Sequence, residues 1–251
     1  MDKTLGQHWL VDLATLEEIV QIGQLRKQDL VIEIGPGTGN LTKLLSKAAR
    51  QVIAIEVDPR LIKGLLDLNL KNVTVIEKSI LKVDLNQYQD YKIIANIPYY
   101  LTSKLIRQLG QLKTKPTRVV LLVQREIAQR LTAQPGKLSI LGLTAQFFWD
   151  IELGPIVEPY KFDPAPKVYS QLVILTPRKD KEELQDPEEL FRLIRLGYSS
   201  KRKTLFNNLK WNKSWSNDQL RHILQSNDIA LNIRPQELSL QQWLNLIKYW
   251  I

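Results

Sequence analysis

A buried strand that runs straight into a glycine-rich turn constrains this chain more than any other feature. Residues 30–34, which are apolar except for Glu33, lead into Gly35-Pro36-Gly37-Thr38-Gly39, and a helical spacing of Leu41, Leu44 and Leu45 follows at once. Glycines in such a turn let the backbone approach a ligand closely, and the N-terminus of the next helix faces the same place. The pattern therefore predicts a strand–turn–helix unit that binds a ligand.

Two acidic residues indicate what kind of ligand the turn binds. Glu56 ends the next predicted strand, 21 residues after Gly35, an offset at which an acid reaches ribose hydroxyls in nucleoside-binding units. Glu33 lies beside the turn, where its charge would repel a pyrophosphate but suit a zwitterionic or cationic ligand. The alternative, that Glu56 is only a solvated strand end, is disfavoured because the glycines and Glu33 accompany it.

Helices and strands alternate through the first half of the chain. The apolar periodicity predicts helices at residues 13–22, 59–68 and 101–112, and strands at residues 52–55, 73–76, 91–95 and 118–124. This alternation implies an α/β fold with a doubly wound, mainly parallel, Rossmann-like sheet that binds ligands at its carboxyl edge. Residues 151–157 and 168–176 are predicted to form an antiparallel pair at one edge.

The chain turns charged and loses its apolar periodicity around residues 178–186. Beyond this point only helical patterns occur, at residues 187–196, 204–209, 217–224 and 240–249. We therefore predict two domains, an α/β domain at residues 1–178 and a small all-helical domain at residues 179–251. In the second domain, Trp243 and Trp250 are assigned to packing.

The tetrapeptide Asn96-Ile97-Pro98-Tyr99 follows the predicted strand at residues 91–95. The Asn96 side-chain oxygen and a backbone carbonyl next to Pro98 can each accept an N–H of an exocyclic adenine amine, and Pro98 fixes the shape of the loop. Tyr99 offers a flat face to an extruded base. On its own the tetrapeptide is more simply a strand-terminating turn. The glycine-rich turn and the two acids reverse that preference and favour a site for methyl transfer to an amine.

The positive charge of the chain gathers in two stretches. The formal net charge of +9 favours a polyanionic partner. Residues 101–137 carry eight basic residues against one acid, and residues 191–217 carry seven and no acid. Charge runs are usually solvated faces, but two acid-poor stretches flanking the predicted site favour contact with nucleic acid, weakened steeply by salt. The candidate contact residues are Lys104, Arg107, Arg125, Lys201, Arg202 and Lys203.

The composition argues against disulfide-rich, metal-binding, secreted and membrane-spanning proteins. There is no cysteine, and His8 and His222 are the only histidines, so neither a disulfide framework nor a transition-metal site is expected. The first residues lack the apolar core of a signal peptide, and the longest apolar runs, such as residues 119–123, are too short to span a bilayer. We expect a cytoplasmic enzyme or nucleic-acid binder with no membrane partner.

With these motifs in order, the chain resembles the S-adenosylmethionine-dependent ribosomal RNA adenine N6-dimethyltransferases of the KsgA type. The resemblance covers nearly the whole chain and is specific because seven motifs occur in the right order. They are LGQHWL at residues 5–10, EIGPGTG at 33–39, IEVD at 55–58, NIPY at 96–99, FDPAPKV at 162–168, KRKTL at 201–205 and RPQELS at 234–239.

The resemblance implies dimethylation of two adjacent adenines near the 3′ end of small-subunit (16S) rRNA during ribosome assembly, by a chain that we expect to be a monomer. S-adenosylmethionine would be the methyl donor. Asn96 and the Pro98 carbonyl would hold the target amine. Tyr99 and Phe162, the latter on a linker stiffened by three prolines, would sandwich the base. The first domain would be catalytic, and the helical domain would contact RNA.

The resemblance also implies a set of cofactor residues. His8 and Leu10 would cover the cofactor, Gly35 and Gly37 would approach its methionine end, and Glu56 would take the ribose. Glu33, Ser79, Ile80 and Asn96 complete the predicted set. Where the family usually has an Asp that accepts from the adenine amine of the cofactor, this chain has Ser79. A neutral acceptor predicts cofactor binding weaker by roughly 1–2 kcal/mol.

Two other functions remain open from the sequence. The nearer is the related adenine N6-methyltransferase of large-subunit rRNA that confers macrolide resistance, which shares the catalytic motifs. Residues 234–239 and the helical tail favour the small-subunit enzyme. The second is a non-enzymatic RNA-binding or transcription factor on the same fold, in which residues 78–80 would mark decay of the cofactor pocket. The intact Glu33, Gly35, Glu56 and Asn96 argue against it.

Overall fold

The structure of the protein is a computed structural model that describes residues 8–98, 101–178, 186–212 and 215–250. The chain divides into two compact units, one formed by Met1–Ala128 with Trp149–Arg178, the other by Gln129–Phe148 with Lys179–Ile251. The sequence placed a boundary at residue 178, where the first unit ends, but did not separate Gln129–Phe148 from the α/β domain.

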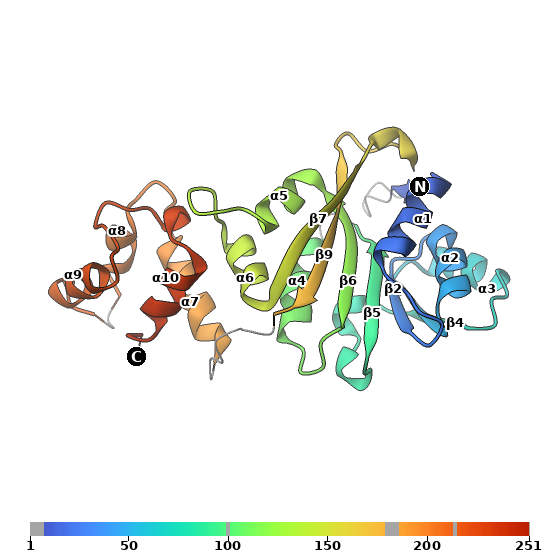
Figure 1. Cartoon of the computed structure of the whole chain (residues 1–251), viewed down its shortest axis with the longest axis horizontal. Helices are drawn as coiled ribbons and strands as arrows, with labels where there is room; N and C mark the ends of the chain where they lie inside the picture. The colour runs from blue at the N-terminus through green and yellow to red at the C-terminus, as the bar shows by residue number, and fades with distance from the viewer. Residues whose placement is uncertain (1–7, 99–100, 179–185, 213–214, 251) are drawn as a thin grey trace. The chain divides into compact units, whose positions relative to one another are not determined.

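A seven-stranded sheet of strand order β4-β3-β2-β5-β6-β9-β7 forms the centre of the first unit (Figure 1). Neighbours from β4 to β6 pair in parallel, whereas β9 pairs antiparallel with both β6 and β7. The predicted doubly wound, mainly parallel fold with an antiparallel edge is confirmed. The strands are β2 (Leu30–Ile34), β3 (Gln51–Glu56), β4 (Val73–Glu77), β5 (Tyr91–Asn96), β6 (Arg118–Gln124), β7 (Trp149–Val157) and β9 (Ser170–Pro177).

The central strands are apolar on both faces because helices cover the sheet on both sides, as in other parallel sheets. Asp12 begins α1 by accepting the Thr15 N–H at 3.0 Å, and Asp58 begins α3 in the same way from the Arg60 N–H. These helices are α1 (Leu13–Ile22), α2 (Asn40–Ala48), α3 (Pro59–Asp67) and α4 (Thr102–Gln111), with short 3₁₀ turns at η2 (Ile80–Lys82), η3 (Leu85–Gln87) and η5 (Pro159–Lys161).

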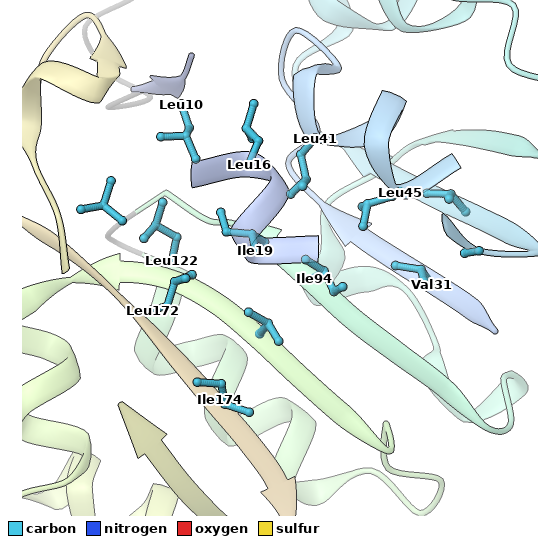
Figure 2. Packing of buried hydrophobic residues seen from close by; sticks show 14 of the residues in the cluster. Leu10, Leu16, Ile19, Val31, Leu41, Leu45, Ile94, Leu122, Leu172 and Ile174 are labelled. Carbon is cyan, nitrogen blue, oxygen red and sulfur yellow. The ribbon is translucent and has the colours of Figure 1, made fainter. Parts of the chain in front are cut away.

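One hydrophobic cluster fills the space between the sheet and helices α1 and α2. Figure 2 shows Ile19 of α1 on the side of Ile94 and Leu122 of the sheet, whereas Leu16 of α1 lies on the side of Leu41 of α2. All five side chains are at most 5% exposed. This packing fixes the start of α2, and therefore the glycine-rich turn before it, against the ends of the strands.

The order of the strands reverses at β2, which has β3 on one side and β5 on the other. In open α/β sheets the crevice at such a switch point, beyond the carboxyl ends of the strands, binds the ligand. The glycine-rich turn follows β2, Glu56 ends β3, and Asn96 ends β5. The topology therefore brings the three predicted motifs together.

A second, two-stranded sheet was not predicted from the sequence. Strand β1 (Trp9–Leu10) pairs antiparallel with β8 (Phe162–Asp163), so Trp9 lies opposite Asp163. The pairing joins the N-terminal segment to the proline-rich linker, and it lays residues 8–10 along the wall of the crevice.

The second unit contains only helices among its described residues. Phe147 packs edge-to-face on Phe191 at 5.6 Å between ring centroids, and Tyr198 stacks on Trp243. Helices α5 and α6 were not predicted from the sequence. The helices in order are α5 (Arg125–Leu131), which contains the junction between the units, α6 (Ile140–Phe148), α7 (Pro187–Gly197), α8 (Leu205–Leu209), α9 (Asn217–Ser226), η6 (Pro235–Glu237) and α10 (Leu240–Ile247). No helix in the described part of the chain is long and apolar enough to cross a bilayer.

Candidate active site

A pocket opens at the carboxyl ends of β2, β3 and β5, with an empty volume of about 820 Å³ that includes its open mouth. It brings together eight of the residues singled out from the sequence, which are His8, Leu10, Glu33, Gly35, Gly37, Glu56, Asn96 and Pro98. Within the described residues, no group of three or more His, Cys, Asp or Glu side chains is placed to hold a metal ion.

The glycine-rich turn adopts a left-handed backbone at Gly35 (φ 67°) and at Gly37 (φ 58°). A Cβ on Gly35 would point at the loop after β5, 3.8 Å from Pro98 Cδ and 3.9 Å from the Asn96 carbonyl oxygen. A Cβ on Gly37 would lie 2.9 Å from Cδ1 of Trp9. Glycine is therefore required for conformation at both positions, and at Gly35 it also keeps open the gap that faces Asn96.

Glu56 is 4% exposed and lies at the floor of the pocket. Its carboxylate accepts three backbone N–H groups, from Gly37 (3.2 Å), Val57 (2.8 Å) and Asp58 (2.9 Å). The side chain is thus held in one orientation by the turn and by the start of α3. Two carboxylate oxygens can accept about four hydrogen bonds, so acceptor capacity remains for a ligand hydroxyl.

Glu33 is 2% exposed, and its Oε2 has no hydrogen-bond partner among the described residues. Burial raises the pKa of this carboxyl to about 8; the nearby Glu56 charge adds to the rise, and the Thr42 hydroxyl offsets part of it. A buried carboxyl with one oxygen unpartnered, in the wall of a pocket, fits a ligand that brings a positive charge. The acidic, hydrogen-bond-accepting groups of the pocket therefore suit the sulfonium and amino groups of S-adenosylmethionine.

The Asn96 amide is oriented by the N-terminal segment. Its Nδ2 donates to the His8 backbone carbonyl at 3.2 Å, and the described residues give its Oδ1 no hydrogen-bond partner. The oxygen therefore keeps its acceptor capacity at the wall of the pocket. The Pro98 carbonyl accepts the Leu101 N–H at 3.0 Å, and its second lone pair remains available.

Residues 8–11 are held across the pocket by three contacts, two with the proline-rich linker and one with the start of α2. The His8 ring is 2.7 Å from the Pro164 carbonyl, Asn40 Nδ2 donates to the Leu10 carbonyl at 3.2 Å, and the Val11 N–H donates to the Lys161 carbonyl at 2.9 Å. The sequence analysis did not single out Trp9, Thr38 or Asn40, which also line the pocket. Trp9 lies within the motif at residues 5–10, Thr38 lies within the motif at residues 33–39, and Asn40 directly follows the latter. Their position in or beside these motifs was the only sequence signal that could have identified them.

Three predicted residues do not line the pocket. Phe162 is 4% exposed and belongs to the hydrophobic cluster below α1, and Ile80 is also 4% exposed. Ser79 is half-buried and makes no capping hydrogen bond to the 3₁₀ turn that it begins. Tyr99 lies outside the described residues. The proposed roles of these four residues stay predictions.

The basic residues proposed to contact RNA are all exposed. Lys104 and Arg107 lie one turn apart on α4, whose opposite face packs through Leu105 and Ile106. Arg125 lies at the first position of α5. Lys201, Arg202 and Lys203 lie in the connection between α7 and α8 of the second unit.

Residues 1–251 match the model of one protein family, which is described as "Ribosomal RNA adenine dimethylase". The chain belongs to this family. Ribosomal RNA small subunit methyltransferase A from Leuconostoc citreum is 36% identical over 255 residues, which cover 96% of this chain and 86% of that protein. The protein of the same name from Acaryochloris marina is 38% identical over 257 residues, which cover 97% and 95%.

Two solved structures share the fold of the adenine dimethylase over its full length. A dimethyladenosine transferase from Plasmodium falciparum has a TM-score of 0.83 and 28% identity and covers 96% of both chains. The 23S rRNA methyltransferase ErmE has a TM-score of 0.76 and 25% identity and covers 96% of this chain and 98% of its own. The protein is an rRNA adenine methyltransferase whose methyl donor is S-adenosylmethionine.

Substitution of Gly35 tests whether the gap opposite Asn96 belongs to the cofactor site. We expect Gly35→Ala to weaken S-adenosylmethionine binding, because its left-handed backbone alone costs about 1–2 kcal/mol with a Cβ present and because the methyl group narrows the gap. Gly64→Ala in α3 is the matched control: its Cβ meets nothing within 4 Å. Calorimetric titration and thermal unfolding measure both variants. Wild-type affinity in Gly35→Ala would contradict the assignment.

Proposed function

We propose that this rRNA adenine dimethylase dimethylates N6 of two adjacent adenines near the 3′ end of small-subunit rRNA during ribosome assembly. The observation that carries the proposal is the Asn96 amide, whose Nδ2 is tied to the His8 carbonyl while its Oδ1 is left to accept at the pocket. Relatives named small subunit methyltransferase A, aligned over nearly the whole chain, support this choice of substrate.

The proposed catalysis consists of positioning and electrostatics. S-adenosylmethionine supplies a methyl group made electrophilic by its sulfonium. Asn96 Oδ1 and the Pro98 carbonyl accept the two N–H groups of the adenine amine, which turns the nitrogen lone pair away from the ring and toward the pocket. No strong base is required. Tyr99 and Phe162 are proposed to stack on the extruded base and to offset its unstacking.

The proposed cofactor contacts follow from the polar groups of the pocket wall. Glu33 meets the positively charged methionine end, and Glu56 accepts from a ribose hydroxyl. Gly35 and Gly37 allow close approach of the backbone, and His8 with Leu10 covers the ligand. Ser79 and Ile80 are proposed to lie at the adenine end of the cofactor.

The macrolide-resistance type is the second candidate, because ErmE shares the fold at 25% identity. The higher identities of 36% and 38% to small-subunit enzymes favour the first. A non-enzymatic factor is disfavoured because Glu33, Glu56 and Asn96 line one pocket. We further propose a monomer that acts in the cytoplasm, where ribosomal subunits are assembled. Lys104, Arg107, Arg125 and residues 201–203 are proposed to contact the rRNA backbone.

Mass spectrometry of both ribosomal RNAs tests the proposal directly. Small and large subunits from cells lacking this methylation are incubated with the protein and S-adenosylmethionine, and the nucleosides are then mapped. We expect two N6-dimethyladenosines near the 3′ end of 16S rRNA and none in 23S rRNA. Modification of 23S rRNA alone would assign the chain to the macrolide-resistance type.

A further inference from the structure

Trp211 is the one exposed tryptophan of the six in the chain, all of which lie among the described residues. Its side chain is 80% exposed, whereas Trp149, Trp215 and Trp243 are at most 8% exposed. Trp250 is half-buried, stacks edge-to-face on Trp215 and donates to Glu189 at 2.9 Å. Packing therefore accounts for these tryptophans and leaves Trp211 unexplained.

One cation lies over the exposed ring, and a second lies over the ring of the nearby Phe206. Lys210 Nζ lies 5.2 Å from the centroid of the Trp211 ring. Lys210 follows Phe206 by four residues in helical conformation, so the two side chains share one face. The Arg221 guanidinium of α9 lies 5.4 Å over the Phe206 ring. Two aromatic rings and two cations thus alternate along one surface of the second unit.

The charge of the neighbouring chain makes this surface complementary to a polyanion. Residues 191–217 contain no acid. Lys201, Arg202 and Lys203, which precede α8, are exposed. A membrane-binding or protein-binding patch gathers several exposed apolar side chains, whereas Trp211 is the only exposed large apolar side chain among the described residues between 186 and 230.

Helix α8, which ends two residues before Trp211, is held against α7. Asn208 Nδ2 donates to the Ser200 carbonyl at 3.0 Å and also to the Gly197 carbonyl, which fixes α8 against the end of α7. Trp215 Nε1 donates to the Tyr249 carbonyl at 2.8 Å. A ring presented on a fixed backbone loses little conformational entropy when a ligand covers it.

We propose that Trp211 is a stacking platform for an unpaired base of the rRNA substrate, with Lys210 and Arg221 beside the adjoining phosphates. This inference rests on the proposed function, since it assigns a second contact to the same RNA. Aromatic rings set in a basic surface bind single-stranded RNA by stacking, whatever the base.

The test compares Trp211→Ala with Trp211→Phe in binding to protein-free 16S rRNA. We expect Trp211→Ala to bind about 5- to 100-fold more weakly and Trp211→Phe to recover most of the loss. Tyr249→Ala, which removes another exposed aromatic ring from the same unit, should bind like the wild type. Trp211 is exposed, so thermal unfolding should be unchanged in its variants.

The salt dependence separates stacking from charge. Trp211→Ala should shift the plot of log Kd against log salt without changing its slope, whereas Lys210→Gln should lower the slope by roughly 0.7 for one phosphate of a single strand. Unchanged binding of Trp211→Ala would overturn the proposal. A loss seen with assembled subunits but not with protein-free rRNA would also overturn it, because it would assign Trp211 to a ribosomal protein. Methylation by the wild type tests the proposed function separately.

Discussion

Asn96→Ala should lose methyl transfer almost completely while S-adenosylmethionine still binds. Loss of one preorganised polar group that acts on the reacting centre typically costs about 10²- to 10³-fold in kcat. We propose Asn96 Oδ1 as such a group, since the amide is held through Nδ2 by the His8 carbonyl. Single-turnover transfer of labelled methyl groups to small-subunit precursors measures the effect.

Asn96→Asp is the sharper variant because it preserves shape and the acceptor oxygen. The oxygen that replaces Nδ2 faces the His8 carbonyl, so two acceptors meet where a donor and an acceptor were paired. We expect Asn96→Asp to lose about as much methyl-transfer activity as Asn96→Ala. The dissociation constant for the cofactor should change by less than about threefold in Asn96→Ala. A fully active Asn96→Ala protein would remove Asn96 from catalysis.

S-adenosylmethionine should bind more tightly as the pH rises from 6 to 8. Burial raises the pKa of Glu33 from 4.5 to about 8, so the carboxyl is protonated in the empty pocket at neutral pH. A positively charged ligand requires the carboxylate, and binding below pH 8 therefore releases a proton. The dissociation constant should fall by up to about tenfold for each pH unit and level off near the raised pKa. Calorimetry in buffers of different ionisation enthalpy counts the released proton.

Glu33→Gln is the matched control for this linkage. Glu33→Gln should bind S-adenosylmethionine with no such pH dependence and with no proton release. Its affinity should fall furthest below that of the wild type at pH 8. The stability of the empty protein gives an independent check. The pKa of Glu33 is higher in the folded than in the unfolded protein. Its contribution to the free energy of unfolding is therefore full below pH 4.5 and is lost as the pH rises to about 8. The melting temperature of the wild type should therefore fall relative to Glu33→Gln over this range. Equal pH profiles would place Glu33 outside the linkage.

The elements that the sequence predicted best are those with a local signal at both ends. Helix α1 and strand β6 occupy the predicted residues 13–22 and 118–124. Asp12 caps α1 and Gly23 follows it, and β6 is an apolar run followed by charged residues. The periodicity that separates helix from strand is strong in both segments.

The elements that were missed lack such a signal. Helix α6 has the sequence ILGLTAQFF, which is apolar on nearly all sides and so shows no helical period. Strands β1 and β8 contain two residues each and pair across most of the first unit's sequence, Trp9 with Asp163. No local pattern encodes a contact between residues so far apart in the chain.

The candidate site divides in the same way. Sequence motifs placed Gly35, Glu56 and Asn96 correctly at the edge of the sheet, because parallel strands deliver their carboxyl ends to one place. The raised pKa of Glu33 could not be predicted from the sequence, because it depends on how deeply the carboxyl is buried and on its distance from Glu56. The position of Phe162 in the hydrophobic cluster likewise depends on where β8 pairs.

The hydrogen bond between Asn96 and the His8 carbonyl has a consequence for the order of events during turnover. The carbonyl that orients the Asn96 amide belongs to His8, which directly precedes β1 and lines the pocket. If that strand shifts to admit a fresh donor, the amide is released to rotate, and it regains its aim when the strand returns. We therefore expect donor loading and alignment of the purine to be coupled, in a sequential mechanism in which the nucleotide enters last.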